Sequence, residues 1–264
     1  MKIALTIAGS DSGGGAGIQA DLKTFQQFGV FGTSVIVALT AQNTRGVRAV
    51  HTAPEAMVRD QLAALTDDLP PSALKTGMLA TVPLVHLVAD WIAAHRWREY
   101  VCDPVMVATS GDRLLSAEAE RIVRDRLLPL AALVTPNLEE AALLASRTVN
   151  DPASMEAAGR DLLALGAQAA LIKGGHLSGG GEVVDVLVMP SAVRHYRRPR
   201  IDTRSTHGTG CTLSAAVTAC LARKVGLERA VTAALDYVHR AIAAAPGLGS
   251  GHGPLDHTVP AIIT

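Results

Sequence analysis

The segment Thr206–Thr212 combines residue types that can bind an anion with one that can accept a proton. Its sequence is Thr-His-Gly-Thr-Gly-Cys-Thr. Apolar residues then recur at helical spacing, at Leu213, Val217, Cys220 and Leu221. Arg223 and Lys224 are expected in the last turn of this helix, and Gly226 at its end. Gly208 and Gly210 would then lie at a helix N-terminus, where free N–H groups and the helix dipole favour a phosphate.

Cys211 is expected in the first turn of the same helix, where a thiolate is favoured. A simpler interpretation is a helix start punctuated by glycines, followed by a small buried cysteine. The segment alone is compatible with both interpretations.

Short apolar runs alternate with helical patterns along most of the chain. Strands are predicted at 3–8, 33–39, 74–76, 100–103, 133–135 and 169–173, with a hairpin at 183–189 and 193–196. Further helices are predicted at 18–28, 54–69, 81–95, 116–128, 154–165 and 228–245, and from 136 onward. Loops are predicted at 106–112, 179–181 and 247–254. The alternation predicts a three-layer α/β/α fold in one domain, residues 1–264, with a mainly parallel central sheet.

In sheets of this kind, ligands bind beyond the carboxyl ends of the strands. The candidate residues at or just past those ends are Gln42, Met78, Asp103, Asn137, Glu140 and Lys173. We therefore expect them to share one site with the segment Thr206–Thr212.

Composition narrows the possible classes of protein. The 264 residues are 48% hydrophobic and carry no net charge, whereas a nucleic-acid-binding protein usually has a basic excess. The local basic run at 194–200 is interpreted as a solvated strand edge. Three scattered cysteines form neither a disulfide framework nor a metal-binding pair, which fits a reducing cytoplasm. The apolar run at 3–8 is too short for a signal peptide, and no run is long enough to span a membrane.

A glycine-rich loop at 9–17 follows the first predicted strand. It ends in Gly17-Ile18-Gln19, so it lacks the Gly-Lys-Ser/Thr ending of a Walker A loop. It does fit a loose dinucleotide-binding pattern, but that pattern requires an acid after the second strand, and 40–43 contains none. A dinucleotide-dependent oxidoreductase is therefore disfavoured.

Taken together, the motifs resemble those of the hydroxymethylpyrimidine and phosphomethylpyrimidine kinases of thiamine synthesis. The resemblance covers the whole chain in the family's order. The matching segments are 8–25, 41–46, 75–79, 135–141, 173–176, 206–212 and 251–254. The resemblance implies a ribokinase-like fold, a homodimer, and phosphorylation by ATP with Mg²⁺ of a hydroxymethyl-aminopyrimidine and then of its monophosphate.

On the substrate side, the resemblance assigns Gln42 to the pyrimidine, because a carboxamide pairs a donor and an acceptor with an exocyclic amine and its neighbouring ring nitrogen. Met78 and Val105 would be apolar walls against the ring. Gly9 would allow the backbone to approach the substrate closely. Asp21 is either a further substrate contact or a solvated helix acid.

On the nucleotide side, the resemblance implies that Lys173 meets the ATP phosphates and that Asn137 and Glu140 form an Asn-x-x-Glu motif. Glu140 and Asp103 would hold Mg²⁺, which keeps several of its waters. The N–H groups that hold the transferred phosphoryl would come from Gly208, Thr209 and Gly210. Cys211 would be the general base in place of the aspartate of related sugar kinases, and His207 receives no role.

Two alternatives remain. Some members with this cysteine-type loop accept pyridoxal, so a pyridoxal kinase is the nearest alternative. A non-catalytic ligand-binding protein on the same fold is the other, although the set Asp103, Glu140, Lys173 and Cys211 argues against it.

Overall fold

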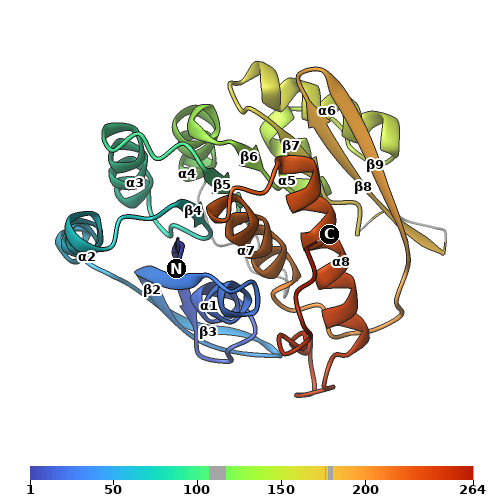
Figure 1. The fold of residues 1–264 in the computed structure, drawn as a ribbon, viewed down its shortest axis with the longest axis horizontal. Coiled ribbons are helices and arrows are strands. Elements are labelled where there is room, and N and C mark those ends of the chain that lie inside the picture. The colour runs from blue at the N-terminus through green and yellow to red at the C-terminus, as the bar shows by residue number, and fades with distance from the viewer. Residues whose placement is uncertain (107–116, 176, 178–180, 264) are drawn as a thin grey trace.

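The computed structural model describes residues 1–106, 117–175, 177 and 181–263 (Figure 1). Its strands are β1 Ile3–Asp11, β2 Phe31–Asn43, β3 Gly46–Thr52, β4 Ala73–Thr76, β5 Tyr100–Cys102, β6 Leu133–Val134, β7 Ala170–Ile172, β8 Glu182–Met189 and β9 Ala192–Pro199. Its α-helices are α1 Gly17–Gln27, α2 Glu55–Asp68, α3 Val82–Ala94, α4 Ala117–Ile122, α5 Leu138–Ala145, α6 Pro152–Ala164, α7 Thr209–Ala222 and α8 Leu227–Ala243.

All these strands belong to one sheet, in the order β3-β2-β1-β4-β5-β6-β7-β8-β9. Strands β2, β1, β4, β5, β6 and β7 are parallel to one another. At the two edges of the sheet, β3 pairs antiparallel with β2, and β8 pairs antiparallel with β7 and β9. The strand order reverses between β1 and β4, and this reversal creates a crevice beyond their carboxyl ends. The predicted three-layer fold with a mainly parallel sheet is confirmed.

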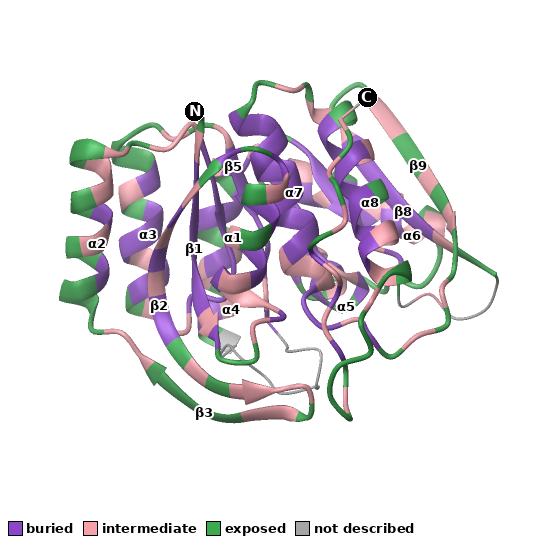
Figure 2. Ribbon diagram, turned by 60° about the horizontal axis from the view of Figure 1, so that its bottom comes forward, coloured by how far each residue is buried: buried purple, intermediate pink, exposed green. Residues whose placement is uncertain are grey.

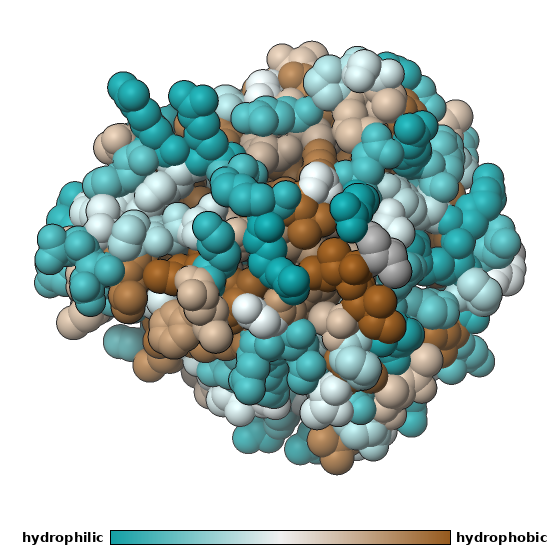
Figure 3. Space-filling view, viewed as in Figure 1, coloured by the Kyte–Doolittle hydropathy of each residue, from teal (hydrophilic) through white to brown (hydrophobic). Residues whose placement is uncertain are grey.

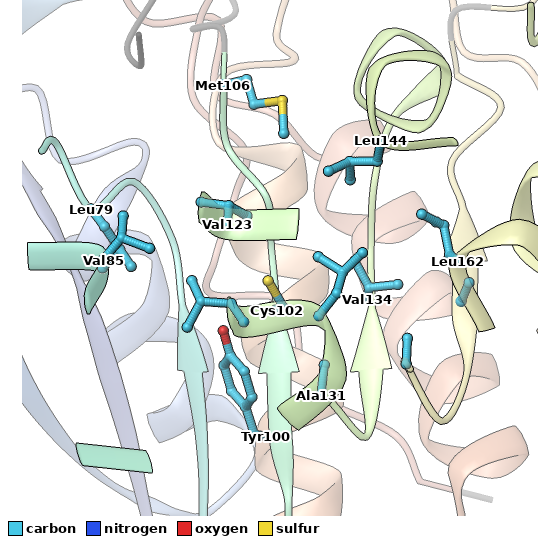
Figure 4. Close-up of a cluster of buried hydrophobic side chains, with 14 of the residues drawn as sticks. Leu79, Val85, Tyr100, Cys102, Met106, Val123, Ala131, Val134, Leu144 and Leu162 are labelled. Atoms are coloured by element: carbon cyan, nitrogen blue, oxygen red, sulfur yellow. The ribbon is translucent and has the colours of Figure 1, made fainter. Parts of the chain in front are cut away.

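The central strands of the sheet are buried on both faces because helices cover each face, whereas β3 and β9 at the edges are largely exposed (Figures 1 and 2). Alternate residues of β1 point to opposite faces, as the period of a strand requires. Leu5 and Ile7 join a core cluster with residues of α2, α3, α4, α5 and α6, and Ala4 joins a second cluster with α1, α7 and α8. Figure 4 shows part of the first cluster, where Tyr100, Cys102 and Val134 come from neighbouring strands.

Helix α7 differs from its prediction in two respects. Every residue from Thr212 to Ala222 is buried, so the helix is enclosed on all sides beyond its first turn and does not present the single apolar face that was predicted. The helix also ends at Ala222, before Arg223, and Lys224 adopts a left-handed conformation with φ of 63°. Gly226 is the residue before α8, so it starts the next helix and does not end α7.

Strand β3 was not predicted, and β2 runs four residues beyond its predicted end at Leu39 to pair with it. The helix predicted at 116–128 changes after α4 to a π-helical turn, Val123–Leu127, and then a 3₁₀ turn, Leu128–Leu130. The predicted loop at 106–112, the glycine turn at 179–181 and the start of the helix at 116 fall wholly or mostly outside the described residues.

The surface in Figure 3 is mainly hydrophilic at its outline, with hydrophobic residues gathered toward the middle of that face. The predicted solvated strand edge is β9, where Arg194 is exposed and pairs with Glu228. The prediction is wrong for Arg198, whose side chain is only 15% exposed, pairs with Asp236 and lines a cavity. Within the described ranges, no helix has the length and apolar character needed to cross a membrane.

Candidate active site

A cavity of about 680 Å³ opens at the carboxyl ends of the parallel strands, where the strand order reverses. Its size is typical of small-molecule sites. The sequence-predicted residues that line it are Gly9, Gln42, Met78, Asp103, Val105, Asn137, Glu140, Lys173, Gly208, Thr209, Gly210 and Cys211. The fold therefore brings together every candidate except Asp21.

The N-terminus of α7 lines this cavity, and two of its glycines allow close approaches by other parts of the chain. Gly208 has φ of 81°, and a Cβ there would overlap the carbonyl oxygen of Gly15 in the glycine loop. A Cβ on Gly210 would stand 3.2 Å from Nζ of Lys173. Glycine at these positions leaves the first N–H groups of α7 open beside a lysine ammonium, which is an environment suited to an anion.

The glycine loop is folded around the carboxylate of Asp11. This carboxylate accepts hydrogen bonds from the backbone N–H groups of Gly13 at 2.8 Å, Gly15 at 3.1 Å and Ala16 at 2.9 Å. Nε2 of His207 donates to the same carboxylate at 2.8 Å. Burial raises the pKa of Asp11, but the hydrogen bonds from His207 and Gly13 outweigh it, so the net pKa is lowered. His207, which sequence reasoning left without a role, thus ties the loop to the start of α7.

Asp103, just past β5, is the centre of a second buried network. Its carboxylate lies 3.3 Å from Nζ of Lys173 and accepts hydrogen bonds from Thr135 at 3.3 Å and Ser214 at 3.1 Å. Although burial lowers the pKa of Lys173, Asp103 and Glu140 raise it overall, so the lysine is a cation at neutral pH. The network fixes a positive charge beside the start of α7.

Glu140 and Asn137 form a reciprocal cap at the start of α5. The Asn137 side chain accepts from the Glu140 N–H at 2.9 Å, and the Glu140 carboxylate accepts from the Asn137 N–H at 2.8 Å. Burial raises the pKa of Glu140 to about 7, helped by nearby Asp103 and opposed by Lys173. The motif thus anchors a carboxylate that faces the cavity.

The donor set suits Mg²⁺ that is held partly by a ligand. Glu140 and Asp103 both bring carboxylates to the cavity. In the part of the chain that the structure describes, no cluster of three or more His, Cys, Asp or Glu residues could hold a metal ion. Mg²⁺ commonly binds one or two carboxylates and takes its remaining ligands from water and phosphate. These two carboxylates therefore fit it as a partial site.

Cys211 lies in the first turn of α7 and lines the cavity. Burial raises the pKa of its thiol to about 11, although Lys75 and a hydrogen bond from the Gly17 N–H lower it. The expectation of a favoured thiolate is therefore wrong for the ligand-free protein, in which the neutral thiol predominates at pH 7. Cys102 and Cys220 are fully buried, and burial raises the pKa of each to about 12.

The substrate-side candidates line the part of the cavity nearest β1, β2, β4 and β5. Gln42 lies near the end of β2 and not in a loop, and its Oε1 is 3.2 Å from Oγ1 of Thr40. A Cβ on Gly9 would stand 2.7 Å from Cε of Met78, so this glycine makes room for the methionine. Val105 follows Asp103 in the cavity wall.

Asp21 does not reach the cavity, and neither expectation for it holds. It is fully buried in α1, where its carboxylate pairs with Nζ of Lys75 at 2.8 Å and accepts a hydrogen bond from Thr6 at 2.6 Å. Asp21 is therefore a buried member of an ion pair beneath the cavity. It is neither a substrate contact nor a solvated acid.

Several cavity residues were not identified from the sequence. Asp185 of β8 lies at the β7 end and accepts the N–H of Gly174 at 2.9 Å, while His239 comes from α8. Val47 of β3 and His252 of the C-terminal segment complete the β2 end. An acid within the apolar strand β8 was the one visible signal among them; the others depend on how distant segments meet.

Fold and geometry together define an α/β protein with a small-molecule cavity that joins an anion-binding helix start to two carboxylates and a lysine. The family model described as phosphomethylpyrimidine kinase matches residues 11–256, and the chain belongs to this family.

Two curated relatives show the extent of the similarity. The chain is 50% identical to hydroxymethylpyrimidine/phosphomethylpyrimidine kinase of Rhizobium meliloti, over 97% of this chain and 96% of the relative. It is 48% identical to the thiamine biosynthesis bifunctional protein ThiED of Geobacter sulfurreducens, over 97% of this chain but only 52% of that protein. The chain therefore spans about half the length of the bifunctional relative.

One solved structure shows how similar the fold of this chain is to that of a known kinase. The ADP complex of Bacillus subtilis pyridoxal kinase superposes with a TM-score of 0.91 at 40% identity, covering 98% of each chain.

Proposed function

We propose that this protein uses ATP to phosphorylate 4-amino-5-hydroxymethyl-2-methylpyrimidine and then its monophosphate. One observation carries the proposal: a single cavity joins Gln42 and Met78 at the β2 side to Lys173 and Glu140 at the β7 side, with Cys211 between them on α7. Family membership and the names of the relatives support the substrate class. The ADP complex of the Bacillus subtilis relative supports the nucleotide.

In the proposed reaction, the start of α7 and Lys173 hold the phosphoryl group as it moves. The N–H groups from Gly208 to Gly210 and the Lys173 ammonium face the place where its negative charge is spread. Asp103 and Glu140 would hold Mg²⁺, which neutralises phosphate charge when it is bound. Asp103 also keeps Lys173 in place through their ion pair.

Cys211 is proposed as the general base. Its thiolate takes the proton of the substrate hydroxyl while that oxygen forms a bond to the γ-phosphorus. The bond from phosphorus to the bridging oxygen breaks, and its electron pair leaves with ADP. Because the thiol form predominates in the ligand-free protein, only the minor thiolate population is competent at neutral pH.

Gln42 and Met78 are proposed to select the ring. The carboxamide of Gln42 can pair with an exocyclic amine and the adjacent ring nitrogen. Met78, 8% exposed and packed close to Gly9, offers an apolar surface to the flat ring.

The test is an ADP-release assay on three acceptors: the pyrimidine alcohol, its monophosphate and pyridoxal. Turnover of the first two above pyridoxal is expected. Preference for pyridoxal would establish the second candidate, which the likeness to Bacillus subtilis pyridoxal kinase favours. Absence of ADP release with every acceptor would instead indicate a ligand-binding protein without catalysis.

We also propose a homodimer that works in a reducing compartment. Leu39 and Val50 of the β2–β3 edge are about half exposed, which leaves apolar side chains for a second copy to cover. All three cysteines are free. Light scattering coupled to gel filtration tests the dimer, and a monomer at micromolar concentration would contradict it.

A further inference from the structure

A buried ion pair lies beneath the cavity, and the proposed mechanism does not use it. Lys75 of β4 and Asp21 of α1 are both fully buried, and their charged atoms are 2.8 Å apart. Replacing such pairs with apolar residues is often neutral or stabilising, because burial removes both charges from water. Stability alone therefore gives no reason for this pair.

The alternation of side chains along β4 puts Lys75 on the face of the sheet that α7 covers. Leu74 belongs to the core cluster on one face of the sheet and Ala73 to the cluster that contains α1 and α7. Lys75 shares the face of Ala73 because side chains alternate along a strand. Neighbouring Thr6 of β1 stands opposite Lys75 in the parallel register and donates its hydroxyl to Asp21.

The lysine ammonium lies just below the cavity. A Cβ on Gly77, which lines the cavity, would stand 3.9 Å from Nζ of Lys75. Of the three ammonium donors, one is directed to Asp21, and the other oxygen of Asp21 is occupied by Thr6. Of the two charged ends of the pair, the ammonium is therefore the one found next to a residue that lines the cavity.

Four charged groups act on the Cys211 thiol from the surrounding elements. They are Lys75 from β4, Asp21 from α1, Asp103 past β5 and Lys173 past β7. Among these, Lys75 has the largest effect and favours the thiolate, while Asp21 opposes it more weakly. The net electrostatic effect of the Lys75–Asp21 pair on the Cys211 sulfur is therefore that of a positive charge, which favours the thiolate.

We propose that Lys75 is a positioning residue whose buried ammonium stabilises the thiolate of Cys211, and that Asp21 holds this ammonium in place. The proposal rests on the base role given to Cys211 above. Lys75 is fully buried and is not among the residues that line the cavity, so its proposed effect is exerted through the sulfur.

Two variants that differ only at Lys75 test the proposal: D21N and K75M/D21N. The measurement is the rate at which iodoacetamide alkylates Cys211, followed on its own peptide by mass spectrometry at about pH 8.5, because only the thiolate reacts. We expect K75M/D21N to react at least about tenfold more slowly than D21N, which corresponds to one pKa unit. Equal rates would overturn the proposal.

T6V is the matched control, since it removes the uncharged partner of Asp21 and leaves both charges. It is expected to react like the wild type; slowing as large as in K75M/D21N would mean that loosened packing, not charge, controls the sulfur. Circular dichroism confirms that each variant is folded, and K75Q/D21N supplies the same comparison if the methionine variant is not.

Kinase assays separate this proposal from the proposed function. The kcat of K75M/D21N should fall below that of D21N at neutral pH, with the difference narrowing as pH rises and KM for ATP unchanged. If Cys211→Ala keeps full activity, the base role fails, but the alkylation comparison still reports whether Lys75 controls the thiol.

Discussion

At the scale of single residues, Cys211 is the side chain on which the proposed chemistry depends most. Cys211→Ala should lower kcat at least about tenfold, at the low end of the effect of a general base. Because burial raises its pKa to about 11, the wild-type kcat/KM should rise with pH up to that range, and the alanine variant should lose this rise. Steady-state ADP-release kinetics from pH 6.5 to about 10 measure both effects.

Cys220→Ala is the matched control for that experiment. Cys220 lies on the same helix, is fully buried and does not line the cavity. Its replacement should leave the pH profile unchanged. A normal pH profile and full kcat in Cys211→Ala would exclude the thiolate as base.

Gln42 gives the residue-scale prediction for substrate recognition. Gln42→Ala should raise KM for the pyrimidine about tenfold or more, because a bidentate pair is worth roughly 1–3 kcal/mol. The KM for ATP should hold, since Lys173 and Glu140 lie several strands away from β2. Initial rates with each substrate varied in turn provide the measurement; an effect confined to ATP would contradict the assignment.

At the scale of elements, the glycine loop and α7 are joined through Asp11 and His207. Asp11→Asn should destabilise the protein by about 2 kcal/mol at pH 7, because hydrogen bonds to a buried charge are weakened. The pKa of Asp11 is lowered below 3.8, so its stabilisation is complete above that pH and is lost as pH falls through the folded-state pKa. Urea unfolding at pH 7 and near pH 3 should therefore show a difference that shrinks in acid.

Asp125→Asn provides the control for this linkage. Asp125 also has a lowered pKa, but it is exposed and its ion pair is with its neighbour Arg124. Such surface pairs contribute little to stability, so its replacement should barely change the urea midpoint. If Asp11→Asn lowers the free energy of unfolding equally at both pH values, the negative charge of Asp11 does not stabilise the loop.

The same scale shows what the sequence could and could not predict. Parallel strands such as β1 are buried on both sides, and their apolar runs identify them together with the site residues at their ends. Strand β3 is an exposed edge without alternation, so its sequence carries no strand period. The location of Asp21 depends on Lys75, 54 residues away, and no local pattern reveals a buried pair formed across such a distance.

The thiolate of Cys211 was mispredicted for a related reason. A position in the first helical turn favours a thiolate when the sulfur is exposed to solvent. Here α7 is buried from Thr212 onward, Cys211 is only partly exposed where it lines the cavity, and loss of hydration outweighs both the helix start and Lys75. Burial of a whole helix is a property of the packed layers, which the periodicity of α7 did not reveal.

At the scale of the whole molecule, two apolar clusters lie on opposite faces of one sheet. The shared strands connect the clusters, and this supports the prediction of one domain over residues 1–264. If that prediction holds, the two faces cannot unfold independently, because strands β1, β4, β5, β6, β7 and β8 each contribute buried side chains to both clusters.

Val85→Ala and Val217→Ala test this cooperativity from opposite faces. Val85 lies on α3 in one cluster and Val217 on α7 in the other, and both are fully buried. Each truncation should cost about 2 kcal/mol from lost burial and the cavity that remains. Trp91 and Trp97 pack against the cluster of Val85, so their fluorescence reports that face. A single domain requires Val217→Ala to lower the unfolding midpoint seen by tryptophan as much as the midpoint seen by circular dichroism. If the tryptophan transition stays at its wild-type position while the helical signal is lost earlier, the two faces unfold separately, and the chain behaves as two units.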